Sequence, residues 1–247
     1  METFPLHVHP FPTAQEAGQV AGNHAAQILN SALQSGGRAR VMLAAAPSQL
    51  HTLKTLTRSD LDFSRIDFFH MDDYLGLDPE HPVGFGKWLI TNFLSSLPAV
   101  GNFHRMDMSL PPEDAAANYA ELMGDAPFDV TLCGLGVNAH LAFNDPPADF
   151  HAPRSVEVVD LSYESRKQQV DEGHFPDVDS VPSQATTVTI PRLLNAHHII
   201  CSVPTSAKRQ AVTNTIGNEP DPMIPGTALK LHPDAHLYVD REAYPHD

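Results

Sequence analysis

The segment FDVTLCGLGVNAHLAFNDPP, Phe128 to Pro147, joins an apolar run to a glycine-rich turn and decides between two kinds of α/β fold. The apolar run predicts a buried strand, and the turn fits the pattern G-x-G-x-x-A, which in dinucleotide-binding folds opens a helix that holds a pyrophosphate. Pro146, Pro147 and Pro153 would stop such a helix within two turns. The sequence therefore favours a loop that presents side chains at a strand end. Asp160, an acid near the offset of a ribose-binding carboxylate, keeps the dinucleotide alternative open.

Apolar runs and helical patterns alternate along the rest of the chain. Strands are expected at 40–46, 66–70, 128–134, 156–161, 185–190, 198–203 and 235–240. Helices are expected at 13–35, 47–56, 84–97, 111–124, 162–170, 191–196 and 205–216. Continuous apolar strands separated by helices predict an α/β, Rossmann-like, three-layer fold with a mainly parallel sheet and helices on both faces. We expect one domain over residues 1–247.

The charge balance limits the classes of partner. The chain has 15 Lys and Arg against 30 Asp and Glu, a formal net charge of −15, which disfavours nucleic acid and anionic membranes. A phosphate ester is not excluded, because a few cations and helix N-termini can act locally while distant charge is screened. Two cysteines in apolar runs and the lack of a long apolar segment predict a cytoplasmic protein.

Polar residues follow four of the expected strands, where ligands of open parallel sheets bind. Asp72 and Asp73 follow the strand at 66–70. They could form a solvated turn, or one of them could be a carboxylate base whose pKa is raised by burial. His140 follows the glycine turn, either as a core histidine or as an acid–base group oriented by Asp145 with Asn138 beside it. His7 and His9 form an H-x-H pair, but no third ligand lies at a metal-binding spacing from them, so no metal is expected.

Two further strand ends carry residues suited to an anion. Lys208 lies in the first turn of the helix expected at 205–216. It is either a surface lysine or a phosphate ligand that acts together with the N–H groups at the start of the helix. Ser48, in the turn before the helix at 47–56, supplies a second donor. The four places together predict a site for a small anionic ligand at one end of the sheet.

The four motifs FHMDDYLGL, CGLGVNAHLAFNDP, VPSQATTVTIPRLL and VPTSAKRQAV, in this order, resemble the glucosamine-6-phosphate deaminase (isomerase) family. The resemblance runs from about Val41 to Asp240, and H-L-A-F-N-D-P is of the deaminase type rather than that of the related 6-phosphogluconolactonases. It implies a Rossmann-like fold, no cofactor, and conversion of glucosamine 6-phosphate to fructose 6-phosphate and ammonia, or a close variant.

The resemblance also implies a role for each matched residue. His140, oriented by Asp145, would open the sugar ring, and Asp72 would move the proton between C2 and C1. Asn138 stands beside them, where the family has an aspartate. The sugar phosphate would lie against the following residues: Ser48, Lys208, Ala45, Ala46, Gly136 and Arg166.

Departures from the family pattern concern mainly the phosphate end. Ala45-Ala46-Pro47-Ser48 stands where T-G-S-[ST] is common, which removes a hydroxyl donor. The arginine of the family's N-S-R-F-F segment has no clear match, and Arg166, Lys167 or His174 is expected to replace it. Ala139 replaces a glycine, and Asp145 a glutamate. A lactone hydrolase and a non-catalytic sugar-phosphate-binding protein remain alternatives, and a homo-oligomer remains possible.

Overall fold

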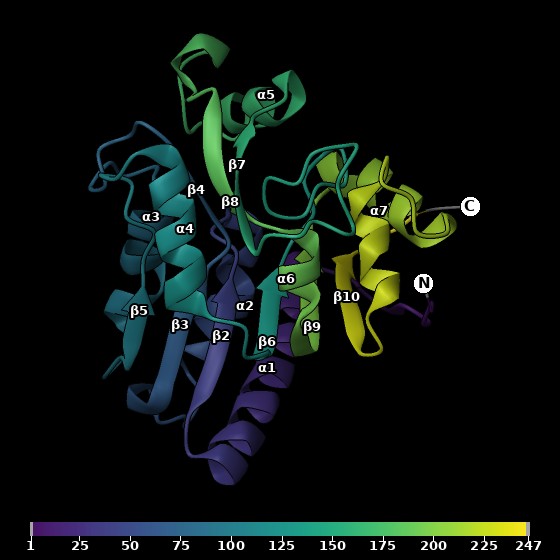
Figure 1. Ribbon diagram of the computed structural model, residues 1–247. Helices are drawn as coiled ribbons and strands as arrows, with labels where there is room; N and C mark the ends of the chain where they lie inside the picture. The colour runs from purple at the N-terminus through teal and green to yellow at the C-terminus, as the bar shows by residue number, and fades with distance from the viewer. Residues whose placement is uncertain (1, 246–247) are drawn as a thin grey trace.

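The main sheet of the computed structural model, which describes residues 2–245, has seven parallel strands in the order β1-β10-β9-β6-β2-β3-β5. Their bounds are β1 His7–Phe11, β2 Ala39–Leu43, β3 Ile66–His70, β5 Asn102–His104, β6 Phe128–Cys133, β9 Ala196–Val203 and β10 Ala235–Asp240. β2 and β6 lie near the middle of the sheet and are almost fully buried. Figure 1 shows the strands side by side with helices before and behind them.

Helices cover both faces of this sheet. The α-helices of the described residues are α1 Ala14–Gly36, α2 Leu50–Leu56, α3 Phe85–Asn92, α4 Pro112–Met123, α5 Tyr163–Asp171, α6 Ile190–Leu194 and α7 Arg209–Gly217, of which α5 lies beyond the main sheet (Figure 1). Alternate residues of β2 enter separate apolar cores, because side chains of a strand point to opposite faces. Val41 and Leu43 pack with α1 and α2, whereas Met42 packs with α4 and α6. The expected three-layer α/β fold is confirmed.

A second sheet of three antiparallel strands lies beyond the carboxyl ends of the main strands. β4 (Asp72–Tyr74) pairs with β8 (Gln184–Val188), which pairs with β7 (Val156–Asp160). The strands expected at 156–161 and 185–190 are present as β7 and β8, but they form this second sheet, since an apolar run specifies a strand and not its partner. Figure 1 shows β7 and β8 rising above the main sheet with α5 at their far end.

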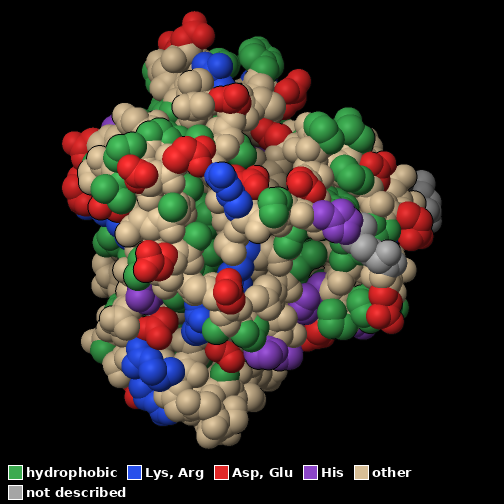
Figure 2. Space-filling model, in the orientation of Figure 1, with side chains coloured by type: hydrophobic (Ala, Val, Ile, Leu, Met, Phe, Trp, Pro, Cys, Tyr) green, Lys and Arg blue, Asp and Glu red, His purple; other side chains and the backbone are tan. Residues whose placement is uncertain are grey.

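Short 3-10 helices link these elements at the turns. They are η1 Pro47–Gln49, η2 Phe63–Arg65, η3 Leu94–Ser96, η4 Val178–Ser180, η5 Ser206–Lys208 and η6 Pro225–Leu231. The segment from α5 to η4 joins β7 to β8, and we call residues 161–183 the cap segment. No helix within residues 2–245 is both long and apolar enough to cross a membrane. Figure 2 shows carboxylates spread over the visible face, with fewer Lys and Arg between them.

Candidate active site

A cavity of about 540 Å³ lies where the main strands end and the cap segment begins. Turns after β2, β3, β6 and β9 line one side of the cavity, and the cap segment lines the other. Its lining includes these predicted residues: Ala45, Ala46, Ser48, Asp72, Gly136, His140 and Lys208. The topology thus brings the four motifs together at one end of the sheet, as expected for a parallel α/β fold.

Asp72 is the buried carboxylate of this cavity. Asp72 is only 7% exposed, and burial together with the adjacent charge of Asp73 raises the pKa of its carboxyl well above the usual value. His70, fully buried at the end of β3, fixes the backbone here: its Nδ1 lies 2.9 Å from the Asp72 carbonyl oxygen, and its Nε2 accepts from the Met106 N–H. Because Nδ1 must donate to the carbonyl and Nε2 must accept, His70 is neutral with its proton on Nδ1. Burial therefore makes Asp72 a carboxyl group that holds a proton more tightly than an ordinary aspartate, which suits a group that removes and returns protons.

Asp73 has a structural task instead. Its carboxylate accepts from the backbone N–H groups of Phe85 and Gly86, at 3.0 and 2.9 Å, and so satisfies the N-terminus of α3. It also accepts from the N–H of Tyr74 at 2.9 Å. The two neighbouring aspartates thus separate into a cavity-lining group and a helix cap, which the sequence alone left undivided.

His140 is held by a group of polar side chains behind the cavity wall. Its Nδ1 lies 3.1 Å from Asp145 Oδ1 and 3.0 Å from Ser165 Oγ, and Ser165 Oγ donates to the same Asp145 oxygen at 2.6 Å. Asn138 Nδ2 donates to that oxygen as well, at 2.9 Å, and the Ser162 N–H donates to Asp145 Oδ2. With Nδ1 donating to the carboxylate, Nε2 of His140 is the free acceptor.

Asp145 stays ionised in this environment. Burial raises its pKa, but the hydrogen bond and charge of His140, with donors from Ser165 and Asn138, lower it below its usual range overall. Neither Asp145 nor Asn138 lines the cavity. They orient and support His140, whereas His140 itself reaches the cavity wall.

Gly136 allows the imidazole to lie flat against the chain. A Cβ at this position would come within 2.2 Å of Cε1 and Nε2 of His140. The turn is closed by the Gly136 N–H donating to the His140 carbonyl at 2.9 Å. Ala139, where a glycine was expected from the family pattern, has φ 65° and therefore adopts the left-handed conformation.

The cavity also holds the cation that was predicted to bind an anion, Lys208. Lys208, at the end of η5, has a side chain only 9% exposed, and burial lowers its pKa while Glu172 opposes that effect. Ser48 lies in η1 on the neighbouring turn, where its Oγ accepts from Gln49 Nε2 at 3.1 Å. Thr205, just before η5, has φ 80° and ψ 150°, and Asp240 accepts from its N–H.

The structure places Arg166 outside the cavity. Its guanidinium donates to the Val178 carbonyl within the cap segment and does not line the cavity, so its predicted contact with substrate lacks a geometric basis. The two other residues named with it, Lys167 and His174, do line the cavity. Lys167 forms an ion pair with Asp171 at 2.6 Å.

Sequence reasoning missed four residues: His70, Ser165, Gln168 and Glu172. Only His70 had a usable signal, as the last residue of a buried strand directly before the aspartate pair. The others lie in or just after α5, whose sequence gave no reason to expect them beside the glycine loop.

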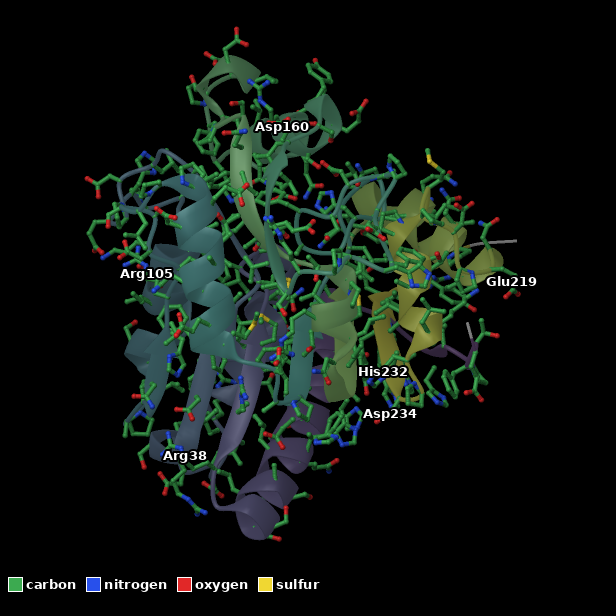
Figure 3. The ribbon with its side chains drawn as sticks, in the orientation of Figure 1. Arg38, Arg105, Asp160, Glu219, His232 and Asp234 are labelled. Atoms are coloured by element: carbon green, nitrogen blue, oxygen red, sulfur yellow. The ribbon has the colours of Figure 1, made fainter. Side chains whose placement is uncertain are left out.

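The dinucleotide alternative is excluded by the structure. Residues 134–155 contain no helix, so no helix N-terminus faces the glycine turn. Asp160 accepts from Gln184 at the end of β7, and Figure 3 shows it high on the small sheet beside α5. Within residues 2–245 no group of three His, Cys, Asp or Glu side chains is placed to hold a metal ion.

Comparisons with known proteins agree with this geometry. The chain is 31% identical over 230 residues to a glucosamine-6-phosphate deaminase of Streptococcus sanguinis (strain SK36), covering 93% of this chain and 96% of that protein. A deaminase of Streptococcus pneumoniae serotype 4 is 28% identical over 226 residues, covering 91% of this chain and 95% of that protein.

Solved structures extend the comparison to the fold. A monomeric glucosamine-6-phosphate deaminase superposes with a TM-score of 0.89 at 25% identity, covering 96% of this chain and 98% of the other. A 6-phosphogluconolactonase from Thermotoga maritima has the same fold, with a TM-score of 0.79 at 17% identity over 96% and 100% of the two chains. Residues 12–238 match the family described as glucosamine-6-phosphate isomerases/6-phosphogluconolactonase, and the chain accordingly belongs to that family.

Proposed function

We propose that this chain is an amino-sugar phosphate isomerase that deaminates glucosamine 6-phosphate to fructose 6-phosphate and ammonia. The observation that carries the proposal is the pairing of a buried carboxyl, Asp72, with an oriented imidazole, His140, in one cavity. Its relatives named as glucosamine-6-phosphate deaminases support the same reaction. A protein that only binds a sugar phosphate has no use for such an acid–base set.

Ring opening is the task we assign to His140. In the cyclic sugar a proton leaves the hydroxyl at C1 and a proton arrives at the ring oxygen O5. Nε2 of His140 is the free acceptor, and Asp145 stabilises the imidazolium that forms when it takes the proton. Ser165 and Asn138 hold Asp145 in place, so they act on the step through His140.

Movement of the carbonyl from C1 to C2 is the task we assign to Asp72. Its carboxylate removes the proton at C2, the electron pair shifts towards C1, and the carbonyl oxygen at C1 takes a proton from the ammonium group at C2, which gives an enolamine. The same carboxyl then returns a proton to C1. The C2 imine that results adds water and releases ammonia, leaving the ketose. A raised pKa makes this carboxylate a stronger base than an ordinary aspartate, which favours removal of a weakly acidic C–H proton.

Lys208 and the turn at Ser48 form the end of the cavity where we place the 6-phosphate. Lys208 supplies the charge, Ser48 a hydroxyl, and the turn of residues 44–48 contributes backbone groups. Lys167 and His174 line the same cavity and are the candidates for further contacts.

The test is turnover of glucosamine 6-phosphate by the purified protein, with fructose 6-phosphate and ammonia both measured. We expect both products in equal amounts, and we expect Asp72→Asn to abolish them while the substrate still binds. Asp114→Asn, an exposed carboxylate of α4, serves as the control and should keep its activity. Absence of both products with the wild-type protein, or normal turnover by Asp72→Asn, would contradict the proposal.

A further inference from the structure

Lys208, which lines the cavity, has an ion-pair partner within the chain. Glu172, directly after α5 in the cap segment, places Oε1 3.5 Å from Nζ of Lys208. The two side chains are 25% and 9% exposed, so the pair is only partly open to solvent. Lys208 has no other ion-pair partner among residues 2–245. The carboxylate therefore lies at the group that a phosphate would need.

The position of Glu172 is fixed by its neighbours rather than by Lys208 alone. Gln168 Nε2 donates to Glu172 Oε1 at 2.7 Å, and His174 Nδ1 lies 4.0 Å from Oε2. Gln168 also accepts from the N–H of Val137 at 3.0 Å, which joins α5 to the glycine loop. The cap segment thus carries a carboxylate into the cavity on a hydrogen-bonded scaffold.

The other charged groups of the cavity do not compensate for this carboxylate. Besides Asp72 and Glu172, the lining includes Glu164 and Asp171, against two lysines, Lys167 and Lys208. Lys167 is paired with Asp171. A phosphate entering beside Lys208 therefore meets a like charge at close range, which disfavours its binding unless that charge moves away.

We infer that Glu172 is a specificity-determining residue that competes with the anionic group of the substrate for Lys208. A phosphate binds only by displacing the Glu172 carboxylate from Nζ of Lys208. Breaking this ion pair costs free energy, and that cost lowers the affinity for phosphorylated ligands. This inference rests on the proposed function in one respect, that the substrate's phosphate lies at Lys208.

The first test compares kinetics with glucosamine 6-phosphate for the wild type and Glu172→Gln. The amide keeps the shape and can still accept from Gln168, but it loses the charge. We expect KM to fall by about threefold to tenfold, the size of a partly exposed ion pair, with kcat changed less than about twofold. Asp179→Asn removes a charge from the cap segment outside the cavity and should leave both constants unchanged. An unchanged or higher KM in Glu172→Gln would overturn the inference.

The second test separates this inference from the proposed function, since it needs no turnover. Inorganic phosphate is titrated by calorimetry into the wild type, Glu172→Gln and Lys208→Met. We expect tighter binding by Glu172→Gln than by the wild type and none by Lys208→Met. Equal binding by the first two proteins, or no binding by either, would overturn the inference even if glucosamine 6-phosphate is turned over. Conversely, tighter phosphate binding by Glu172→Gln in a protein without deaminase activity would support it while the proposed function fails.

Discussion

Gly136→Ala is the substitution that tests most directly whether the position of His140 sets the rate. The added Cβ would lie 2.2 Å from Cε1 and Nε2 and 2.4 Å from Cδ2 of the imidazole. Carbon atoms in contact stay about 3.5 to 4.0 Å apart, so the ring must shift by more than about 1 Å. Such a shift breaks the hydrogen bond between His140 Nδ1 and Asp145, because the two atoms already lie 3.1 Å apart and a hydrogen bond is lost near about 3.6 Å.

A misplacement of about 1 Å at a reacting group costs roughly 100-fold in rate, which corresponds to about 2.7 kcal/mol of transition-state stabilisation. We therefore expect kcat for glucosamine 6-phosphate to fall by about two orders of magnitude in Gly136→Ala. KM should change little, because the substitution does not alter Lys208 or Ser48, the residues assigned to the phosphate. Steady-state assays of ammonia release measure both constants.

Gly217→Ala is the matched control, since a Cβ there meets nothing within 4 Å. It should retain the wild-type kcat and KM. Thermal unfolding of both variants shows whether the fold is intact. A folded Gly136→Ala protein whose kcat stays within about threefold of the wild type would refute the reasoning, because the imidazole would then tolerate the shift.

Two predictions concern stability. Folding raises the pKa of Asp72, so the carboxyl binds a proton more tightly in the folded protein than in the unfolded chain. Ionising Asp72 therefore destabilises the fold. This loss of stability is absent below about pH 3.9 and grows as the pH rises towards the folded pKa. Asp72→Asn should therefore have a higher Tm than the wild type at pH 7.5 and an equal one near pH 4; equal values at both would show that the buried charge costs nothing. Thr205 has φ 80°, a conformation that strains a side chain with a Cβ, and it is exposed. Thr205→Gly should raise the free energy of unfolding by about 1 kcal/mol in urea titrations, whereas Thr91→Gly in helix α3 should lower it; a destabilised Thr205→Gly would contradict the assigned strain.

The strand and helix order was predictable because each element carries its own local pattern. A helix was expected from residue 13, for example, and α1 begins directly after Thr13, whose Oγ1 accepts from the Glu16 N–H at 3.2 Å. No local sequence pattern, however, specifies the sheet to which a strand belongs. β7 and β8 have the sequence of ordinary apolar runs, yet they form a sheet with β4, a three-residue strand that a single residue, Met71, separates from β3.

The same distinction separates the parts of the site. Asp72, His140 and Lys208 each follow a buried strand, and parallel strands bring their carboxyl ends to one edge, so their convergence could be expected. Ser165 lies 25 residues from His140, and Glu172 lies 36 residues from Lys208. Their contacts depend on how the cap segment folds back over the sheet, which no spacing in the sequence specifies. For the same reason no spacing shows that Lys167, rather than the adjacent Arg166, lines the cavity.

Ala139 shows how a departure from a family pattern is accommodated within the loop. A non-glycine residue at positive φ costs roughly 1 to 2 kcal/mol, but this methyl group is only 1% exposed and recovers part of that cost by burial in the core. The Ala139 N–H donates to the Gly136 carbonyl at 3.0 Å, and Asn138 Oδ1 accepts from the His140 N–H at 3.2 Å. Asn138 thus fixes the strained backbone on one side while its amide nitrogen holds Asp145 on the other. A carboxylate at position 138 could accept the first hydrogen bond but could not donate the second, so the amide matches the ionised Asp145 that this loop contains.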